Sequence, residues 1–327
     1  MRRNIAFLTM TFALLAGLVY MGLPKPSSPI RALRVSRLGS TAKPAWSQTG
    51  EKLARANAGH IFVYDLTKYV YNDPRTTKPI LVAEIRTPGI ERLDWSPDDR
   101  LLLAQISTND IFKSHMLVDL KTEGARTLEV DSHKNRMAEF FFWRSATVLG
   151  AVVPSDRFGS PYPHGRLAAV DIESGIERRD EGYLNTVTLS VHPQDLSDIE
   201  IPSEYEIDYD SFFDDKYLVG RMRRDNGPAD LFALDSATGK AKTLGADIDE
   251  VSVADNGRAV VLRDGSGPVR LAEISSEELK VGKSVTFEDR WGRPLRPTKI
   301  SISPNGRFIA FDNGDPRSPG VYVAPLL

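Results

Sequence analysis

The chain has 327 residues, of which 41% are hydrophobic and 26% charged, and its formal net charge is −2. This composition suits a globular protein with a buried core, which excludes global disorder, and the near-neutral charge gives no basic field for nucleic acid. The absence of cysteine excludes disulfides, thiolate zinc sites, iron–sulfur clusters, c-type haem, lipid attachment through cysteine and cysteine nucleophiles.

The first thirty residues have the layout of a membrane-targeting segment. A basic n-region (residues 1–4) precedes an uncharged run over residues 5–23, and a proline-rich linker (residues 24–30) follows. The run approaches the ~20 apolar residues that cross a hydrocarbon core, and no small-x-small cleavage site ends it. We therefore expect an uncleaved signal anchor that crosses the inner membrane once and leaves the body exported. A cleaved signal peptide, which would release a soluble periplasmic protein, is the alternative.

A strand–turn–strand motif recurs through residues 31–327. In its clearest copies a Ser-Pro pair and Asp, Asn or Gly form a tight turn between apolar strands, because proline presets φ and the other residues accept the positive φ that follows. The two close copies are Trp95–Ala104 and Ser301–Phe311, the weaker ones Trp46–Ala54 and Val253–Leu262, and the degenerate ones Phe142–Gly150 and Phe213–Val219. This recurrence indicates a repeat architecture.

Each copy is followed by a short apolar strand, usually closed by an acidic residue. These strands are Ile61–Asp65, Met116–Asp119, Leu167–Asp171, Leu231–Asp235, Leu271–Glu273 and Val321–Pro325. Their spacing of about 50 residues suits a four-stranded propeller blade, and long helical periodicity is missing. The sequence therefore predicts an all-β fold, a six-bladed β-propeller over residues 31–327.

These motifs resemble the repeat of the TolB-type β-propellers (WD40-like, or PD40, repeats), whose signature is Trp-Ser-Pro-Asp-Gly-x-x-apolar-Ala. The match is close at Trp95–Ala104 and Ser301–Phe311 and loose elsewhere, and Asp99 stands where the family usually has glycine. The resemblance covers residues 31–327 and specifies a blade turn rather than an activity. It implies a propeller and, because the family's propellers commonly work as envelope adaptors, a protein-binding role.

The last repeat ends after its third strand, which would leave the sixth blade with an exposed edge. Residues 31–38 alternate basic and apolar side chains, as a half-buried edge strand does. We expect them to complete the sixth blade; a disordered juxtamembrane linker is the alternative. The stiff linker at residues 24–30 would then hold the propeller within roughly 20 Å of the bilayer.

The sequence contains no nucleophile elbow, phosphate loop, dinucleotide fingerprint or His-Glu-x-x-His motif. His115, His133, His164 and His192 are expected in or beside loops on one face of the propeller, but they come from different blades and lack the short spacing of metal ligands. We therefore assign no catalytic residue, no metal ligand and no cofactor, and favour a binding protein over an enzyme.

An acidic segment at residues 194–210 contains no lysine or arginine and is interpreted as a loop inserted before the fourth blade. Its spacing does not match a calcium loop, which leaves a solvated loop or a docking surface for a basic partner. The candidate partner-binding residues of this segment are Asp195, Asp198, Glu200, Glu204, Tyr205, Glu206 and Asp208.

Two further loops are candidate binding surfaces on the same face. Arg221, Arg223 and Arg224 precede an Asn-Gly-Pro turn, and guanidinium groups suit an anionic ligand, although neighbouring aspartates are expected to neutralise them. Phe158, Tyr162 and His164 belong to an aromatic, proline-rich loop, interpreted as a rigid recognition knob or as a loop packed on its own blade.

The predicted function is that of a non-catalytic scaffold or adaptor in the bacterial cell envelope. The anchor at residues 5–23 and the short linker predict a protein partner that is itself membrane-associated. Two alternatives stay open, because propellers host several chemistries. One is a hydrolase or lyase with a metal at the central channel; the other is a sensor that binds a small anionic ligand.

Overall fold

The computed structural model describes fifteen stretches of the chain. They are residues 29–67, 80–86, 89–109, 112–122, 124–128, 140–143, 145–154, 164–172, 188–190, 205–213, 217–224, 229–235, 241–262, 268–275 and 278–326. Strands dominate these stretches, and within them no helix has the length and apolar character needed to cross a membrane. The expected anchor at residues 5–23 lies outside the described residues.

Six antiparallel sheets of four strands each make up most of the described chain. In sheets one to five the strands follow one another along the sequence. Sheet one contains β3 (Ala45–Trp46), β4 (Lys52–Asn57), β5 (His60–Asp65) and β6 (Ile80–Arg86). Sheet two contains β7 (Ile90–Trp95), β8 (Leu101–Asn109), β9 (Phe112–Asp119) and β10 (Gly124–Leu128). Sheet three contains β11 (Phe140–Trp143), β12 (Val148–Pro154), β13 (His164–Asp171) and β14 (Thr188–Ser190).

The remaining sheets complete the chain. Sheet four contains β15 (Tyr205–Phe213), β16 (Tyr217–Arg224), β17 (Ala229–Asp235) and β18 (Ala241–Gly245), and sheet five contains β19 (Glu250–Val253), β20 (Arg258–Leu262), β21 (Val269–Ile274) and β22 (Leu279–Val285). Sheet six contains β25 (Pro297–Ile302), β26 (Phe308–Asn313), β27 (Val321–Pro325) and β2 (Leu33–Ser36). A small three-stranded sheet contains β1 (Ile30–Arg31), β23 (Phe287–Glu288) and β24 (Pro294–Leu295).

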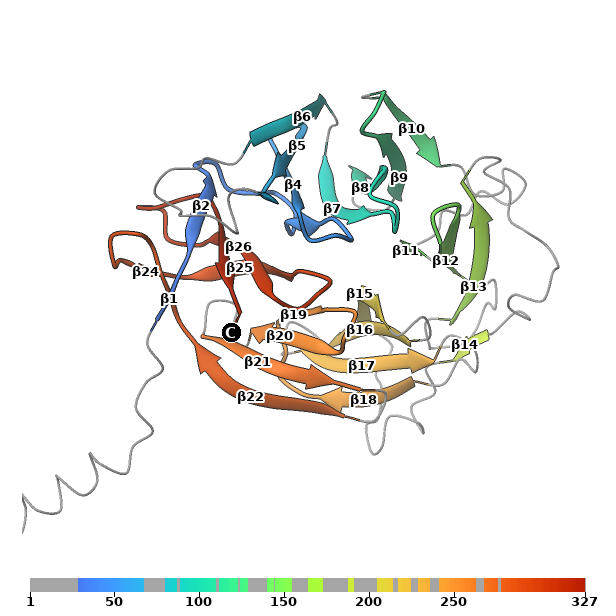
Figure 1. Ribbon diagram of the computed structural model, residues 1–327. Helices are drawn as coiled ribbons and strands as arrows, with labels where there is room; N and C mark the ends of the chain where they lie inside the picture. The colour runs from blue at the N-terminus through green and yellow to red at the C-terminus, as the bar shows by residue number, and fades with distance from the viewer. Residues whose placement is uncertain are drawn as a thin grey trace, which may run out of the picture.

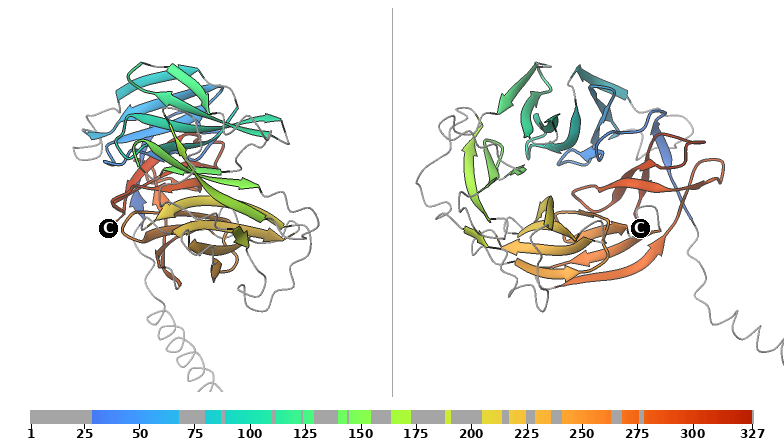
Figure 2. Two further views of the ribbon diagram at one scale, coloured as in Figure 1. Left: turned by 90° about the vertical axis from the view of Figure 1, so that its right-hand side faces the viewer. Right: turned by 180° about the vertical axis from the view of Figure 1, so that it is seen from behind.

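The sheets surround a common centre (Figures 1 and 2). The first strand of each sheet contacts the first strand of the next, and β25 of sheet six contacts β3 of sheet one. The third strands β5, β9, β13, β17, β21 and β27 coincide with the six apolar strands predicted from the sequence. The fold is therefore a β-propeller, as the repeat predicted.

A buried serine explains why the repeat turns look alike. The Oγ of Ser96 accepts the N–H of Leu101 at 2.8 Å, and Ser303 does the same for Phe308 at 2.9 Å. Both serines are completely buried, and each hydroxyl also donates to the Asp or Asn two residues later. Asp99 adopts a φ of 56°, so it takes the left-handed position that glycine holds elsewhere without changing the turn.

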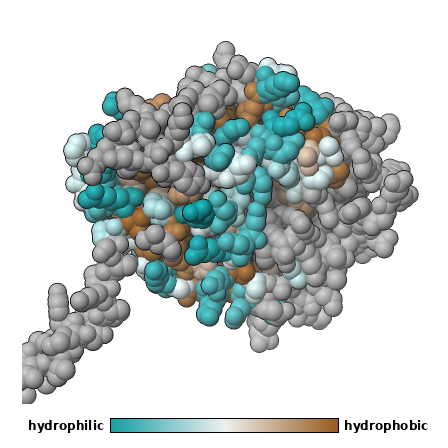
Figure 3. Space-filling model, in the orientation of Figure 1, coloured by the Kyte–Doolittle hydropathy of each residue, from teal (hydrophilic) through white to brown (hydrophobic). Residues whose placement is uncertain are grey.

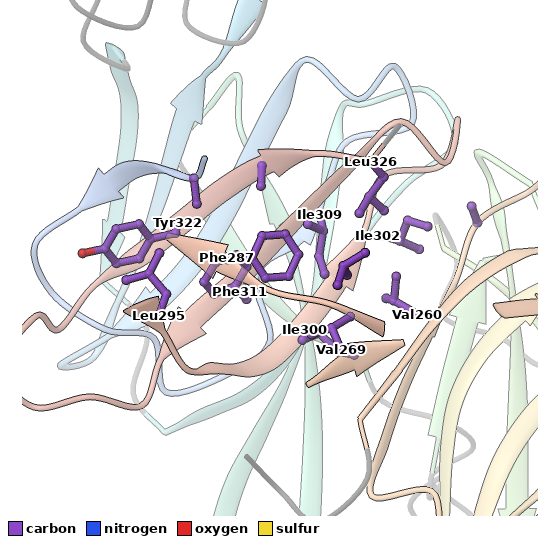
Figure 4. Packing of buried hydrophobic residues seen from close by; sticks show 14 residues of the cluster. Val260, Val269, Phe287, Leu295, Ile300, Ile302, Ile309, Phe311, Tyr322 and Leu326 are labelled. Carbon is purple, nitrogen blue, oxygen red and sulfur yellow. The ribbon is translucent and has the colours of Figure 1, made fainter. Parts of the chain in front are cut away.

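Apolar side chains fill the space between successive sheets. Between sheets five and six, Phe287 and Phe311 pack with their ring centroids 5.0 Å apart, and the Phe311 ring stacks on that of Tyr322 at 5.9 Å (Figure 4). Comparable clusters join sheet one to sheets two and six, sheet two to sheet three, and sheet four to sheet five. Burial against a neighbour on each side gives the sheets their fixed order.

The N-terminal strand β2 closes sheet six. It pairs antiparallel with β27, with Leu33 opposite Val323 and Ser36 opposite Val321. Val35 is 8% exposed and packs between sheets six and one. The prediction that residues 31–38 complete the last repeat is therefore confirmed for Leu33–Ser36. β1, immediately before it, pairs in parallel with β23.

Candidate functional site

Charged residues from sheets one, five and six meet at one end of the innermost strands. Lys43, just before β3, donates from Nζ to the carbonyl of Val251 at 2.8 Å, and its Nζ lies 3.9 Å from Oε1 of Glu250. Oε2 of Glu250 accepts the main-chain N–H of Lys299 at 3.0 Å, and Nζ of Lys299 donates to the carbonyl of Ser40. We call Arg55, Lys43, Glu250, Lys299 and Asp312 the polar cluster.

Lys299 has a strained backbone. Its φ is 51°, and the pairing of β25 with β26 is irregular between Thr298 and Ser301. A left-handed φ at a residue with a Cβ costs on the order of 1 kcal/mol or more, so it persists only where neighbouring contacts enforce it. Here the irregularity turns the N–H of Lys299 towards sheet five and its side chain towards sheet one, which joins three sheets through one residue.

Asp312, at the end of β26, fixes the segment between β2 and β3. Its Oδ2 accepts the N–H of Ser40 at 3.1 Å, and a Cβ on Gly39 would come within 3.0 Å of the same oxygen, so glycine permits the approach. Burial raises the pKa of the Asp312 carboxyl, although the Ser40 hydrogen bond and the Lys299 charge act in the opposite direction. Burial of the charged carboxylate therefore costs free energy, and its hydrogen bond to Ser40 fixes the segment between β2 and β3.

Arg55 secures the same loop from sheet one. It is 2% exposed, donates from Nη1 to the carbonyl of Gly39 at 3.1 Å, and lies 4.2 Å from the centre of the Phe62 ring. Asn57 donates to the same carbonyl at 2.8 Å. In the polar cluster, Arg55 and Lys299 thus donate to main-chain oxygens of the segment between β2 and β3, and Lys43 donates to a main-chain oxygen of β19. The arrangement holds this segment rigid.

The other end of the innermost strands carries the repeat turns, which also contact one another. Asp99 accepts the N–H of Gln48 at 2.5 Å and the hydroxyl of Thr49 at 2.8 Å. The side-chain amide of Gln48 donates to Oδ2 of Asp255 at 2.6 Å, which links sheet one to sheet five. Arg258 of sheet five donates to the carbonyl of Gly306 in the sheet six turn at 3.2 Å. Hydrogen bonds therefore join the sheets at both ends of the central axis.

The described residues include no group of three or more His, Asp or Glu side chains arranged to hold a metal ion. His115 lies inside β9 rather than in a loop, which corrects the sequence interpretation. It is 3% exposed and packs edge-on against Phe141 at 4.5 Å. His164 is the first residue of β13. His133 and His192 lie outside the described residues.

Part of the predicted acidic loop is a strand. Tyr205, Glu206 and Asp208 belong to β15, the first strand of sheet four, so the loop interpretation is wrong for residues 205–210. The sequence carried a signal for this strand, because Tyr205, Ile207 and Tyr209 alternate with acids at a period of two. Asp195, Asp198, Glu200 and Glu204 of the candidate surface lie outside the described residues, as do Phe158 and Tyr162 of the aromatic loop.

The arginines expected beside a loop lie in β16, directly opposite the acids of β15. Arg223 pairs with Glu206, Arg221 with Asp208, and Arg224 with Tyr205. Opposite charges at directly paired positions attract across a sheet. Arg221 also donates to the main-chain carbonyl of Asp249, towards sheet five. Two candidate surfaces that the sequence kept apart therefore share one pair of strands.

A groove of about 310 Å³ lies between sheets five and six. Leu271, Ile302 and Leu326 line it together with charged side chains that include Arg258 and Glu273. The sequence did not indicate it, because its walls come from β20, β21, β22 and one end of sheet six. Hydrophilic residues are interspersed with hydrophobic ones over the face seen in Figure 3.

No family model matches the sequence, and no curated protein does. Among solved structures, an oligogalacturonate lyase in complex with manganese is similar at 17% identity, over 93% of this chain and 95% of that one, with a TM-score of 0.51. A putative TolB from Agrobacterium tumefaciens is similar at 13% identity, over 92% and 100% of the two chains, with a TM-score of 0.50. At such identities the likeness shows the fold alone.

Proposed function

We propose that this TolB-like β-propeller has six blades, one for each four-stranded sheet, and is a non-catalytic protein-interaction scaffold in the bacterial envelope. An uncleaved anchor at residues 5–23 crosses the inner membrane, and the propeller lies on the outer side. The observation that carries the scaffold proposal is the polar cluster, in which Arg55 and Lys299 hold the segment between β2 and β3 through its main-chain oxygens and Lys43 binds the main-chain oxygen of Val251 in β19. Loops held in this way present a rigid surface, and a preorganised surface binds a protein partner with less entropic cost.

The linker supports a partner at the membrane. Pro24, Pro26 and Pro29 lie between the apolar run and β1, and a proline-rich chain extends by ~3 Å per residue. The propeller is thereby held within roughly 20 Å of the bilayer. A partner is accordingly a membrane protein, or a protein that comes to the membrane surface.

The proposed docking surface is the acidic side of sheet four. Residues 194–204 lead directly into β15, and β15 presents Glu206 and Asp208 next to the arginines of β16. In the register these two acids lie opposite arginines, whereas Asp195, Asp198, Glu200 and Glu204 have no lysine or arginine near them in sequence. A basic surface on the partner complements that excess of negative charge.

Capture from gently solubilised membranes tests the proposal with the full-length protein. The variant carries Asp195→Asn, Asp198→Asn, Glu200→Gln and Glu204→Gln, which removes charge without shortening β15. The control carries Glu273→Gln and Glu278→Gln, which neutralise exposed acids of sheet five. We expect one specific partner that the acidic variant loses, the control retains and a chelator leaves bound. No partner in any arm would refute the scaffold.

The likeness to an oligogalacturonate lyase in complex with manganese favours one alternative, a lyase with a metal at the channel. The fold is the only shared property. Incubation of the full-length protein with manganese and oligogalacturonate, with and without chelator, tests it. Chelator-sensitive turnover would replace the scaffold proposal with this alternative.

The anionic-ligand sensor makes a different prediction. Alanine at Arg223 and Arg224 would abolish ligand binding there, whereas the register places Arg223 opposite Glu206 and predicts mainly a loss of stability in sheet four. Thermal unfolding of the double variant, with and without phosphate or a small dicarboxylate, distinguishes the two. Stabilisation of the wild type alone by an anion would support the sensor.

A further inference from the structure

A short hairpin at the edge of sheets five and six holds a tryptophan in solvent. It contains β23 and β24 and turns at residues 289–293. Trp291 is 68% exposed, and among the described residues only Leu38, at 57%, is another exposed large hydrophobic side chain. Tryptophan is enriched at interfaces and at membrane–water boundaries, because it combines a large apolar ring with a polar N–H.

Hydrogen bonds to Asp289 hold the turn rigid, so Trp291 has a fixed position. Asp289 is 4% exposed, and its Oδ1 accepts the N–H groups of Trp291 and Arg293 at 2.8 and 3.0 Å. Its Oδ2 accepts Nε of Arg293 at 2.8 Å. Phe287 and Leu295, on the two strands of the hairpin, are buried in the core between sheets five and six (Figure 4). The hairpin therefore has a fixed base and a fixed tip.

Arg290 and Arg293 lie on the same hairpin as the tryptophan, and Arg31 lies on the neighbouring strand β1. The guanidinium of Arg290 lies 4.5 Å from the centre of the Trp291 ring. Arg31, on β1, has a side chain 73% exposed whose Nε lies 3.6 Å from a carboxylate oxygen of Glu288. The side chain of Arg293 is 56% exposed and pairs with Asp289 at 2.6 Å. Arg37 is exposed beside Leu38. Tryptophan with arginine is the pair of residue types that anchors proteins at the interface of an anionic bilayer, where the ring meets the headgroups and the cations meet lipid phosphates.

The hairpin lies beside the point where the linker reaches the propeller. Ile30 donates its N–H to the carbonyl of Thr286 at 2.8 Å, and Ala32 donates to that of Glu288 at 2.8 Å. β1 thus runs directly along β23 (Figure 1). The linker at residues 24–29 extends at most roughly 20 Å, so the hairpin stays close to any bilayer that holds residues 5–23. Because the linker tethers the hairpin to the membrane, the effective concentration of lipid surface at Trp291 is high.

We infer that the hairpin docks on the anionic lipid surface next to the anchor, with Trp291 in the headgroup region and Arg31 and Arg290 on lipid phosphates. The inference rests on the proposed membrane anchor and extends it. Two attachments, the anchor and the hairpin, fix the orientation of the propeller, which a single linker does not. The docked propeller presents the same surfaces to every partner on the membrane.

Fluorescence quenching by brominated lipids tests the docking with the full-length protein. It is reconstituted in phosphatidylcholine vesicles containing phosphatidylglycerol, with bromine on the acyl chains. The protein has four tryptophans, of which Trp46 and Trp95 are 6% exposed, so a membrane-dependent loss of emission reports mainly Trp291. We expect quenching in the wild type and much less in Trp291→Phe. Equal quenching of both proteins, or none in the wild type, overturns the inference.

A second variant checks the role of charge without removing the probe. Arg31→Gln with Arg290→Gln keeps Trp291, and we expect its quenching to fall in phosphatidylglycerol vesicles and to become insensitive to salt. The control Lys280→Gln with Lys283→Gln removes two exposed cations from β22. Equal losses in both double variants would overturn the lipid-phosphate contacts.

Flotation of the same vesicles reports the anchor separately. A protein that floats while Trp291 escapes quenching overturns the docking and leaves the anchor supported. A full-length protein that is quenched at Trp291 in dilute salt but is stripped from the floating vesicles by high salt supports the docking and overturns the anchor. A protein that neither floats nor is quenched overturns both.

Discussion

Replacement of Gly320 by alanine perturbs the contact that closes the propeller. Gly320 precedes β27 and has a φ of 139°, which residues with a side chain rarely adopt. A Cβ built there would lie 2.1 Å from the carbonyl oxygen of Ser36 in β2 and 3.2 Å from Cδ of Arg34. A backbone oxygen cannot rotate aside as a side chain can, so β2 and β27 must separate by more than 1 Å to reach ordinary contact.

The expected loss of stability combines two contributions. An unfavourable φ at a residue with a Cβ costs about 1–3 kcal/mol, and overpacking against fixed atoms costs about 1–3 kcal/mol more. Gly292 is the matched control, because its φ is 76° but its added Cβ would lie 3.9 Å from the nearest atom, on Glu288. Gly292→Ala should therefore lose only about 1–2 kcal/mol, from the left-handed backbone alone.

Urea denaturation of the full-length protein in detergent measures the difference. The emission of Trp46 is a suitable signal, because its ring packs 6.2 Å from that of Phe308 across the boundary between sheets one and six. Limited proteolysis should also cut Gly320→Ala faster within residues 24–36, as β2 detaches. If the two alanine variants unfold within about 0.5 kcal/mol of each other, the steric account of the closing contact is refuted.

Three further predictions concern other parts of the molecule. Gly220→Ala would place a Cβ 2.4 Å from Cζ of Phe232 and should cost about 1–3 kcal/mol, and Phe232→Leu in the same chain should recover part of that loss; additive free energies in a urea double-mutant cycle would contradict this packing. Burial raises the pKa of Asp312 above its unfolded value, so the wild type gains stability as the pH falls through that raised pKa towards about 3.9. Asp312→Asn should lose this gain when the melting temperature is measured against pH. The same pH dependence in the variant and the wild type would contradict the prediction. For Asp289, burial raises the pKa, but hydrogen bonds from Arg293 and Trp291 outweigh it and leave the pKa lowered, so the stabilisation it gives is present above about pH 3.9 and is lost as the pH falls through the lowered pKa. Asp289→Ala should therefore cost about 1.5–3 kcal/mol at neutral pH and mobilise Trp291. Fluorescence anisotropy equal to that of the wild type would exclude this role.

Local patterns in the sequence predicted the strands well, since each depends on neighbours along the chain. Short apolar runs, five of them closed by an acid, located all six third strands, and the alternation at residues 31–38 located the closing strand. The serine of the two clearest turns was visible in the repeat, but its role was not, because the hydroxyl acts on an N–H five residues away. These features needed only short-range chemistry.

The sites were harder to predict, because they depend on distant pairings. Lys299 meets Ser40, and Gln48 meets Asp255, only after sheets from opposite ends of the chain come together. The acids of residues 205–210 were assigned to a loop because their charge outweighed their alternation, and their arginine partners follow only from the β15–β16 register. The hairpin that exposes Trp291 has strands of two residues each, too short for a periodic signal.

The pairing of β2 with β27 also determines how the protein responds to force. If the proposed anchor holds the N-terminus, a pull on it enters the propeller at β1 and passes at once into the hydrogen bonds between β2 and β27. A pull along these strands stretches those bonds together, in shear, whereas a sideways pull opens them one at a time. A scaffold joined to both a membrane and a moving partner would then resist tension in one direction and yield in the other, and the pairing of β2 with β27 would separate first.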